Sequence, residues 1–236
     1  MEAIILAGGL GSRLSSRIRD IPKPMAPVAG RPFLFILLDQ LIRGGCERIV
    51  LSVGHLREVI INAVGISYKG IPVQYAVEET PLGTGGALRL AMSRAVEPTV
   101  LVLNGDTYVD VDYSAILSLH RSARRTMVVA VTEVQDTGRY GGVVIEDGHV
   151  AGFIEKGQTG PGWINAGVYA IDREFPWPES LESRFSFEKD WLVPNIKHLR
   201  PPAYRCHGRF LDIGVPEDLD LAQIKLRLSP ENNGVR

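Results

Sequence analysis

The stretch AIILAGGLGSRL, residues 3–14, joins an apolar run to a glycine-rich turn that carries a fixed positive charge at Arg13. The run Ala3–Ala7 has the pattern of a buried strand, and a turn with so little side chain leaves its backbone N–H groups accessible. We therefore predict that these N–H groups approach a phosphate chain whose charge Arg13 neutralises. A plain left-handed turn is the alternative, which the glycines alone would favour.

Strand-like runs and helical patterns alternate through the first 134 residues. Four consecutive strand-then-helix units predict an α/β fold, with a mostly parallel sheet and helices on both of its faces. The strands lack a clean alternation of polar and apolar residues, which is typical of strands covered on both faces. The expected strands are Ala3–Ala7, Arg48–Val53, Pro72–Val77, Thr99–Leu103 and Met127–Val134, and the expected helices are Pro32–Arg43, His55–Val64, Gly85–Ala95 and Tyr113–Ser122.

The pattern changes after about residue 135, where hairpins replace the strand-then-helix units. Asp147 and Gly148 lie between two apolar runs and predict a β-hairpin turn. The other expected elements are the strands Gly142–Glu146, His149–Ile154, Trp163–Ile171 and Ala203–Ile213, the helix Phe187–Leu199 with a candidate break at Pro194, and the helix Pro216–Leu228. We expect one domain over residues 1–228, made of a half to about 134 and a half from about 135, with a frayed tail at 229–236.

Composition narrows the class of protein. The chain has 236 residues and a formal net charge of −1, which argues against bulk electrostatic binding to nucleic acid or to an anionic membrane. It lacks a run of ~18 apolar residues, and its first residues lack the basic region of a signal peptide. The two cysteines, Cys46 and Cys206, form no CxxC pair and suggest free thiols in a reducing cytoplasm.

Neither of two common phosphate-binding motifs fits the first turn. A GxGxxG pattern started at Gly9 puts Leu14 where the third glycine belongs, which weakens a nicotinamide-dependent oxidoreductase as an alternative, and GxxxxGK[ST] is absent. The stretch IPKPMAPVAGRP then holds Lys23 between Pro22 and Pro24. Because each proline restricts the backbone, we expect Lys23 on a stiff, non-helical segment as a fixed charge. A solvated lysine in a proline-rich loop is the alternative.

Two acidic residues follow apolar strands far apart in the sequence. Asp106, in NGDTYVD, comes just after TVLVL, and Asp212, in FLDIGVPEDL, ends a late strand. If the two strands are neighbours, both carboxylates converge on one cation, and Mg²⁺ takes one or two carboxylates together with phosphate oxygens. An Asx turn or a helix cap is the alternative role for each. Asp110 and Asp112 are weaker candidates, because Asp112 has the position of a helix N-cap.

Further motifs supply polar groups without a covalent nucleophile. PLGTGGAL, residues 81–88, is a second glycine cluster at a helix start, where a flat base could lie on bare backbone or a helix could simply begin. RYGG, FIEK and WINAGVY offer a carboxylate, an ammonium and an amide, a mixture suited to sugar hydroxyls and a phosphate. No GxSxG motif or Cys/His arrangement is present.

Taken together and in this order, LAGGLGSRL, KPM, PLGTGGA, NGD, EK, NAGVY and DIG resemble the sugar-1-phosphate nucleotidyltransferase family over residues 1–228. The resemblance implies a three-layer, Rossmann-like nucleotidyltransferase core with a small appended β lobe that binds the sugar. It also implies Mg²⁺ as cofactor, a nucleoside triphosphate and a sugar 1-phosphate as substrates, and no nucleic acid or membrane partner. It leaves the oligomeric state open, a homodimer included.

The resemblance also implies roles for individual residues. Arg13, Lys23 and Asp106 would be catalytic, with Lys23 on the α-phosphate, and Asp106 and Asp212 would bind the metal. The implied nucleotide-binding residues are Leu6, Ala7, Gly8, Gly9, Gly11, Ser12, Arg13, Lys23, Pro81, Leu82, Gly83, Thr84, Gly85 and Asp106, and the implied sugar-phosphate residues are Gly141, Glu155, Lys156, Asn165 and Gly167. Ser12 stands where the family often has Thr, and the sequence EKG replaces a frequent EKP, which we expect to loosen the loop at Lys156.

The implied reaction is nucleotidyl transfer, in which a sugar-phosphate oxygen attacks the α-phosphorus and pyrophosphate leaves in line. The attacking oxygen is already an anion, so no general base is required. A non-catalytic sensor of nucleotide sugars would be the rival reading, but it would not need Lys23 and both aspartates. The sequence leaves open whether the base is guanine or uracil, and whether the sugar is a heptose, a hexose or N-acetylmuramate.

Overall fold

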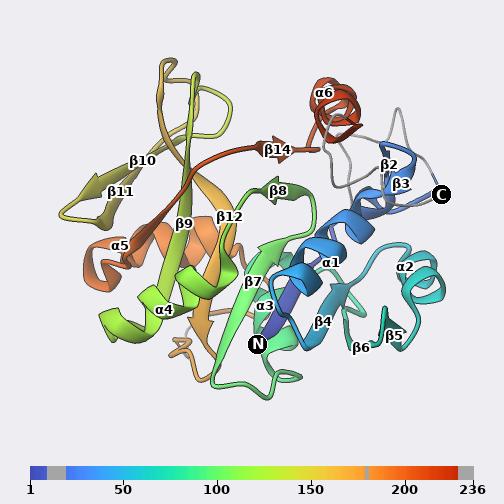
Figure 1. The fold of residues 1–236 in the computed structure, drawn as a ribbon. Coiled ribbons are helices and arrows are strands. Elements are labelled where there is room, and N and C mark those ends of the chain that lie inside the picture. The colour runs from blue at the N-terminus through green and yellow to red at the C-terminus, as the bar shows by residue number, and fades with distance from the viewer. Residues whose placement is uncertain (10–19, 179–180, 228–236) are drawn as a thin grey trace.

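The fold is built on one eight-stranded sheet (Figure 1). The computed structural model describes residues 1–9, 20–178 and 181–227. The strand order is β13-β9-β12-β7-β1-β4-β6-β5. The bounds are β1 Glu2–Leu6, β4 Arg48–Val53, β5 Ser67–Tyr68, β6 Ile71–Val77, β7 Thr99–Asn104, β9 Met127–Val134, β12 Gly162–Asp172 and β13 Ala203–Cys206.

The sheet is mostly parallel, as the sequence predicts, but two strands of the second half, β12 and β13, lie within it. β1 is parallel to β4 and β7, β4 to β6, and β13 to β9. β12 lies antiparallel between β7 and β9, and β5 is antiparallel to β6 at the other edge. Because β9 pairs with β12 and β13, both halves of the chain contribute strands to the same sheet.

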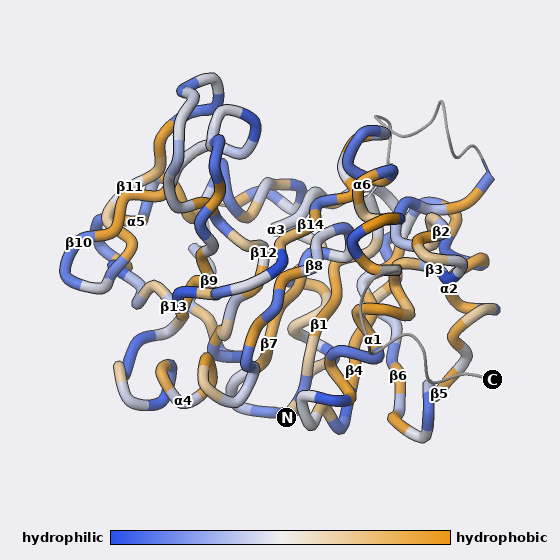
Figure 2. The backbone as a smooth tube through the Cα atoms, turned by 45° about the horizontal axis from the view of Figure 1, so that its top comes forward, coloured by the Kyte–Doolittle hydropathy of each residue, from blue (hydrophilic) through white to orange (hydrophobic). Residues whose placement is uncertain are grey.

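Helices cover both faces of this sheet. The described helices are α1 Phe33–Arg43, α2 Arg57–Val64, α3 Gly83–Met92, α4 Tyr113–Ala123, α5 Val193–Leu199 and α6 Pro216–Arg227, together with the π-helix η3 Phe187–Leu192 and the 3₁₀ turn η2 Lys23–Met25. Alternate residues of β1 face opposite layers: Ile5 packs in the cluster that holds α1, α2 and α4, and Ile4 in the cluster that holds α3, η3 and α5. Burial on both faces explains why the central strands are apolar along nearly their whole length, which Figure 2 shows for β1 and β4.

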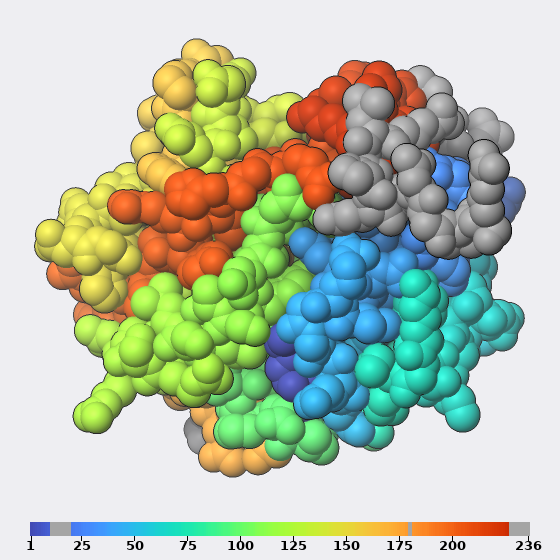
Figure 3. Space-filling model, viewed as in Figure 1, coloured from blue at the N-terminus to red at the C-terminus, as the bar shows by residue number. Residues whose placement is uncertain are grey.

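Among the described residues, three short ladders stand outside the main sheet. β10 Gly142–Glu146 pairs with β11 His149–Ile154 as the predicted hairpin, β8 Thr107–Val109 pairs with β14 Phe210–Asp212, and β2 Pro27–Val28 pairs with β3 Arg31–Pro32. In Figure 3 the segment that contains β13 and β14 crosses the front of the molecule between the hairpin side and α6. None of the described helices is long and apolar enough to cross a membrane.

Two of the predicted elements are each divided into two in the structure. The strand predicted over Ala203–Ile213 is two strands, because Gly208 has a φ of +131° and Asp110 accepts hydrogen bonds from the backbone and guanidinium of Arg209. The helix predicted over Phe187–Leu199 begins as a π-helix and becomes α-helical at Val193, just before Pro194. Pro194 lies in the first turn of the α-helical part, where its missing N–H costs no hydrogen bond.

Glu2 is a buried carboxylate that joins three segments. Its side chain is fully buried and accepts hydrogen bonds from Arg48 Nε at 2.8 Å, from Val96 N at 2.7 Å and from Glu97 N at 2.8 Å. Since these donors cannot all find new partners, removing the carboxylate leaves buried polar groups unpaired.

We expect Glu2→Ala to lower the free energy of unfolding by about 3–5 kcal/mol, measured by urea denaturation, because one partner of a buried ion pair is removed. Glu47→Ala is the matched control, because that carboxylate is exposed and only meets the terminal ammonium; its loss should stay below ~1 kcal/mol. Equal losses in the two variants would contradict this account of Glu2.

Candidate active site

Two acidic side chains meet beside the end of β7. Residue 212 pairs with Thr107 in the β14–β8 ladder, and Ile213 N donates to the carbonyl of Asp106 at 2.9 Å. Burial and then the charge of Asp106 raise the pKa of the Asp212 carboxyl, while Gly214 N donates to its Oδ1 at 2.7 Å. The structure therefore brings together two carboxylates that are 106 positions apart in the sequence.

The start of the glycine loop lies against the same edge. Gly105 N donates to the carbonyl of Leu6 at 2.9 Å, and a Cβ at Gly105 would come within 2.6 Å of that oxygen. This close approach puts Ala7 next to the segment that carries Asp106, while Gly8 lies against Gly54 and Glu78. Gly11, Ser12 and Arg13 lie outside the described residues, so the predictions for them stay predictions.

Lys23 completes the cluster. Its ammonium pairs with the carboxylate of Asp106, and its side chain is only 15% exposed. The expectation of a non-helical segment is wrong, because Lys23 opens a single 3₁₀ turn with Pro24 inside it. Pro22 before it is extended, with φ −66° and ψ 148°, so the two prolines still direct Lys23 inward. Two acids and one ammonium at a strand end are a charge arrangement suited to polyphosphate and a divalent cation.

Glu78, which the sequence analysis missed, is a buried carboxylate between the two glycine-rich segments. It follows β6; its Oε2 accepts a hydrogen bond from Leu82 N at 3.0 Å, and its Oε1 lies 2.1 Å from where a Cβ at Gly8 would be. Burial raises the pKa of this carboxyl, and the hydrogen bonds from Leu82 and Ser52 partly oppose the rise. The only sequence signal for Glu78 is its position just before the PLGTGG motif.

The glycines of PLGTGG have a packing role that the sequence did not reveal. A Cβ at Gly85 would lie 2.1 Å from the ring of Phe185, and one at Gly83 would lie 2.5 Å from the carbonyl oxygen of Phe185. Gly85 N donates to that carbonyl at 2.9 Å, and Phe187 N donates to Thr84 Oγ1 at 2.9 Å. The segment that leads into η3 therefore holds the loop Pro81–Gly85 in place by packing and hydrogen bonds, and this holds with or without a ligand on the loop.

The predicted sugar-phosphate residues fall into two groups. Gly141, with φ +83°, precedes β10, while Glu155 and Lys156 are exposed at the end of β11. Gly157 N donates to the carbonyl of Gly138 at 2.8 Å, a bond that proline could not make. The expected loosening at EKG is therefore opposed by an anchor in the neighbouring loop.

The second group lies on β12. Asn165 donates from Nδ2 to Tyr169 Oη at 2.7 Å and to Glu188 Oε1 at 2.9 Å, and its Oδ1 accepts from Gly167 N at 3.0 Å. A Cβ at Gly167 would lie 2.8 Å from Asn104 Nδ2, so this strand closely approaches the end of β7. Glu188 was a second residue that the sequence analysis did not identify.

The described residues contain no group of three or more His, Cys, Asp or Glu side chains that could hold a metal ion by themselves. Asp106 and Asp212 suit a hard cation that takes its remaining ligands from phosphate and water. Cys46 and Cys206 are free and buried, and burial raises the pKa of both thiols.

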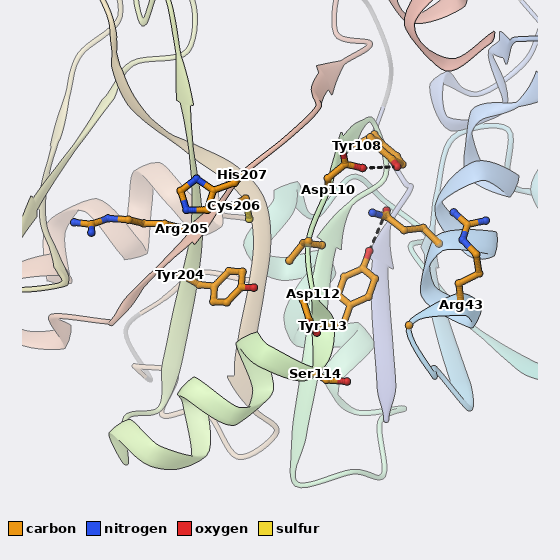
Figure 4. A pocket seen from close by; sticks show the side chains of 13 residues that line it. Arg43, Tyr108, Asp110, Asp112, Tyr113, Ser114, Tyr204, Arg205, Cys206 and His207 are labelled. Atoms are coloured by element: carbon orange, nitrogen blue, oxygen red, sulfur yellow. Dashed lines mark hydrogen bonds between the residues drawn. The ribbon is translucent and has the colours of Figure 1, made fainter. Parts of the chain in front are cut away.

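A hollow of about 650 Å³ lies beside β8 (Figure 4). The end of α1, the start of α4 and β13 line it, and the acid cluster contributes no residue. Asp112 accepts from Ala115 N at 3.0 Å as the N-cap of α4, as the sequence predicts, and Asp110 pairs with Arg209. Both weaker acidic candidates therefore have structural partners.

Comparison with known proteins agrees with this geometry. Residues 2–223 match the family model described as "Nucleotidyl transferase". D-glycero-α-D-manno-heptose 1-phosphate guanylyltransferases of Aneurinibacillus thermoaerophilus and Campylobacter jejuni are 39% and 41% identical to this chain, over 96% and 92% of it and 99% and 96% of their own length. HddC from Yersinia pseudotuberculosis, solved in complex with GMP-PN, has a TM-score of 0.84 and 38% identity, with 95% of this chain and 99% of that chain covered. The chain therefore belongs to the nucleotidyl transferase family, which confirms the resemblance that its motifs carry.

Proposed function

We propose that the protein is a D-glycero-α-D-manno-heptose 1-phosphate guanylyltransferase, which forms GDP-heptose and pyrophosphate from GTP and the heptose 1-phosphate. The observation that carries the proposal is the cluster of Lys23, Asp106 and Asp212 beside the loop after β1. Two enzymes of that name match the chain over 96% or more of their length. The stretches DIPKPMAPV, GRYGGV and FSFEKDWL also resemble that branch of the family. The product would serve surface polysaccharide synthesis.

In the proposed reaction, an oxygen of the sugar phosphate forms a bond to the α-phosphorus while the bond from that phosphorus to the bridging oxygen breaks. Lys23 would leave Asp106 and bind the α-phosphate, which lowers the repulsion between two anions. Mg²⁺, held by Asp106 and Asp212, would supply further charge neutralisation on the phosphates. Alignment of the two substrates between the loop after β1 and the β10–β11 hairpin can contribute ~7–11 kcal/mol to catalysis in favourable cases.

Glu78 favours guanine over uracil in this proposal. Guanine presents two adjacent donors, N1–H and the N2 amino group, and a carboxylate accepts both. Uracil presents one donor between two acceptors, which suits an amide better than a carboxylate. Glu78 already accepts from Leu82 and Ser52, and a carboxylate has about four acceptor sites, so capacity for a base remains. An N-acetylmuramate 1-phosphate uridylyltransferase, the alternative within the family, has no such feature in its favour.

We expect Glu78→Gln to lower kcat/KM for GTP by about 10- to 100-fold and to raise the ratio of UTP to GTP use, because one acceptor becomes a donor. Pyrophosphate release at fixed sugar phosphate measures both. Glu79→Gln is the matched control, because the neighbouring Glu79 side chain is 79% exposed. Unchanged nucleotide preference in a folded Glu78→Gln variant would remove Glu78 from base recognition.

A product screen tests the function as a whole. Four nucleoside triphosphates are crossed with heptose, mannose, glucose and N-acetylmuramate 1-phosphates in the presence of Mg²⁺. We expect the highest kcat/KM with GTP and the heptose 1-phosphate. Preferential use of another pair would reassign the substrates, and binding without pyrophosphate release would favour the non-catalytic sensor. The free buried thiols suit a reducing compartment, and we propose the cytoplasm as the location.

A further inference from the structure

Three side chains form a closed hydrogen-bond network on the hairpin side of the acid cluster. Tyr169 Oη donates to Glu188 Oε1 at 2.8 Å, and Asn165 Nδ2 reaches both the tyrosine oxygen and the same carboxylate oxygen. Tyr169 is about 1% exposed, and burial raises the pKa of its hydroxyl well above the ordinary value, so that it serves as a neutral donor. Both donors thus converge on one oxygen of Glu188.

The network uses up the amide of Asn165. Its Nδ2 serves two partners, and one lone pair of its Oδ1 accepts from Gly167 N. A substrate hydroxyl therefore finds little free capacity on Asn165 itself. Among the described residues, by contrast, no side chain or backbone group donates to Glu188 Oε2, and Glu188 is only half-buried.

Glu188 is also held in position from its own element. Phe187 N donates to Thr84 Oγ1 at 2.9 Å, and Ser186 Oγ accepts from Lys189 N at 3.2 Å as the N-cap of η3. A carboxylate fixed from both sides costs little entropy to engage, because its rotamer is already selected.

The network lies on β12 close to the end of β7, the strand that leads to Asp106. Val168 pairs with Leu103 across β12 and β7, so Gly167 lies beside Asn104, two residues before Asp106. The register of β12 against β9 shifts between Asn165 and Tyr169, and this irregularity brings both side chains to the same network.

We propose that Glu188 is a sugar-binding residue, whose Oε2 accepts a hydrogen bond from one hydroxyl of the sugar 1-phosphate, and that Asn165 and Tyr169 are positioning residues that hold the carboxylate. The inference rests on the proposed function in needing a sugar phosphate at this site. Because a carboxylate repels the phosphate of the substrate, Glu188 would face the sugar ring or the carbon chain attached to it. This helps to set which end of the sugar phosphate points toward Asp106 and Asp212. A hydroxyl donating to an ionised acceptor forms one of the stronger hydrogen bonds available.

Steady-state kinetics of Glu188→Gln tests the proposal. With GTP and the heptose 1-phosphate, KM for the sugar phosphate should rise about 10- to 100-fold, as for a lost hydrogen bond to a charged group, while KM for GTP should change less than twofold. Glu188→Asp keeps the charge with a shorter reach and gives a second variant should the first not fold. Tyr169→Phe should raise the same KM by a smaller factor, with kcat little changed. Asp190→Asn on the same helix is the matched control, because that carboxylate accepts from Ser186 N.

Deoxy analogues of the sugar 1-phosphate identify the partner hydroxyl. The penalty of Glu188→Gln should vanish with the one analogue that lacks this hydroxyl. A penalty that persists with every analogue, an unchanged KM for the sugar phosphate, or an equal effect of Asp190→Asn would overturn the proposal. If wild type turns over a different sugar phosphate in the product screen, the proposed function fails separately, and the same variants are then measured with that substrate.

Discussion

Lys23→Ala should lower kcat by about 100-fold or more while the protein stays folded, since a well-placed charge-stabilising donor is worth roughly 3–4 kcal/mol. The fold directs Lys23 at the acid cluster: a proline stands on each side of it and its ammonium pairs with Asp106. In the proposed reaction that ammonium moves to the α-phosphate, where charge changes during transfer. The measurement is pyrophosphate release at saturating substrates, with far-UV circular dichroism to establish folding.

Lys197→Ala, which removes an exposed lysine of α5, is the control and should keep kcat within twofold. A folded Lys23→Ala variant with kcat within a few-fold of wild type would exclude Lys23 from the mechanism. The ion pair between Lys23 and Asp106 allows a second test of the role of Lys23, through the dependence of activity on Mg²⁺. Because Lys23 would compete with the proposed Mg²⁺ for that carboxylate, its removal should not weaken Mg²⁺ activation, even though kcat falls.

In contrast to the removal of Lys23, replacing Asp106 or Asp212 should weaken activation by Mg²⁺. We expect Asp106→Asn and Asp212→Asn each to raise the Mg²⁺ concentration for half-maximal activity by at least ~10- to 100-fold, since even groups that only support metal ligands typically contribute that much. Each variant keeps the shape of the side chain but removes a negative charge from a shared site. The measurement is a Mg²⁺ titration of pyrophosphate release at saturating GTP and sugar phosphate.

Asp110→Asn provides the matched control, because Asp110 stands at the opposite end of β8 from Asp106 and pairs with Arg209 at 2.9 Å. Its Mg²⁺ titration should match that of wild type. An unshifted titration for one of the two acid variants would exclude that residue as a proposed ligand, and unshifted titrations for both would contradict the proposed metal site.

The sequence predicts the layers of this fold well because burial on both faces leaves a local signature. β4, β9, β10 and β11 have the expected bounds, since their apolar runs end at charged or turn residues. It does not predict that β12 inserts between β7 and β9, because strand pairing across sixty residues has no local signal. The same reason hides the break at Gly208, which depends on the approach of Asp110.

The residues of the candidate site also differ in how well the sequence predicts them. Asp106 and Asp212 could be predicted because each follows an apolar strand, although only the β8–β14 ladder shows that they meet. Glu78 and Glu188 could not, because an acid after a strand or within a helix is usually solvated. The roles proposed for them rest on burial and on partners distant in sequence, which have no local signal. The sequence suggests that the glycines of PLGTGG make room for a ligand. In the structure, the ring and the carbonyl of Phe185 leave no room for a side chain at two of these glycines, whether or not a ligand binds.

The position of β12 has a consequence for how the chain reaches its native state. During synthesis, the strands up to β9 leave the ribosome before residues 162–172, yet β9 has only later strands as neighbours in the sheet. The nascent chain must therefore wait with an unpaired apolar strand, a condition that invites misassociation and chaperone binding. A sheet closed by its last-made strands also gives long-range contacts a large share of the topology, which slows folding relative to a purely sequential α/β order.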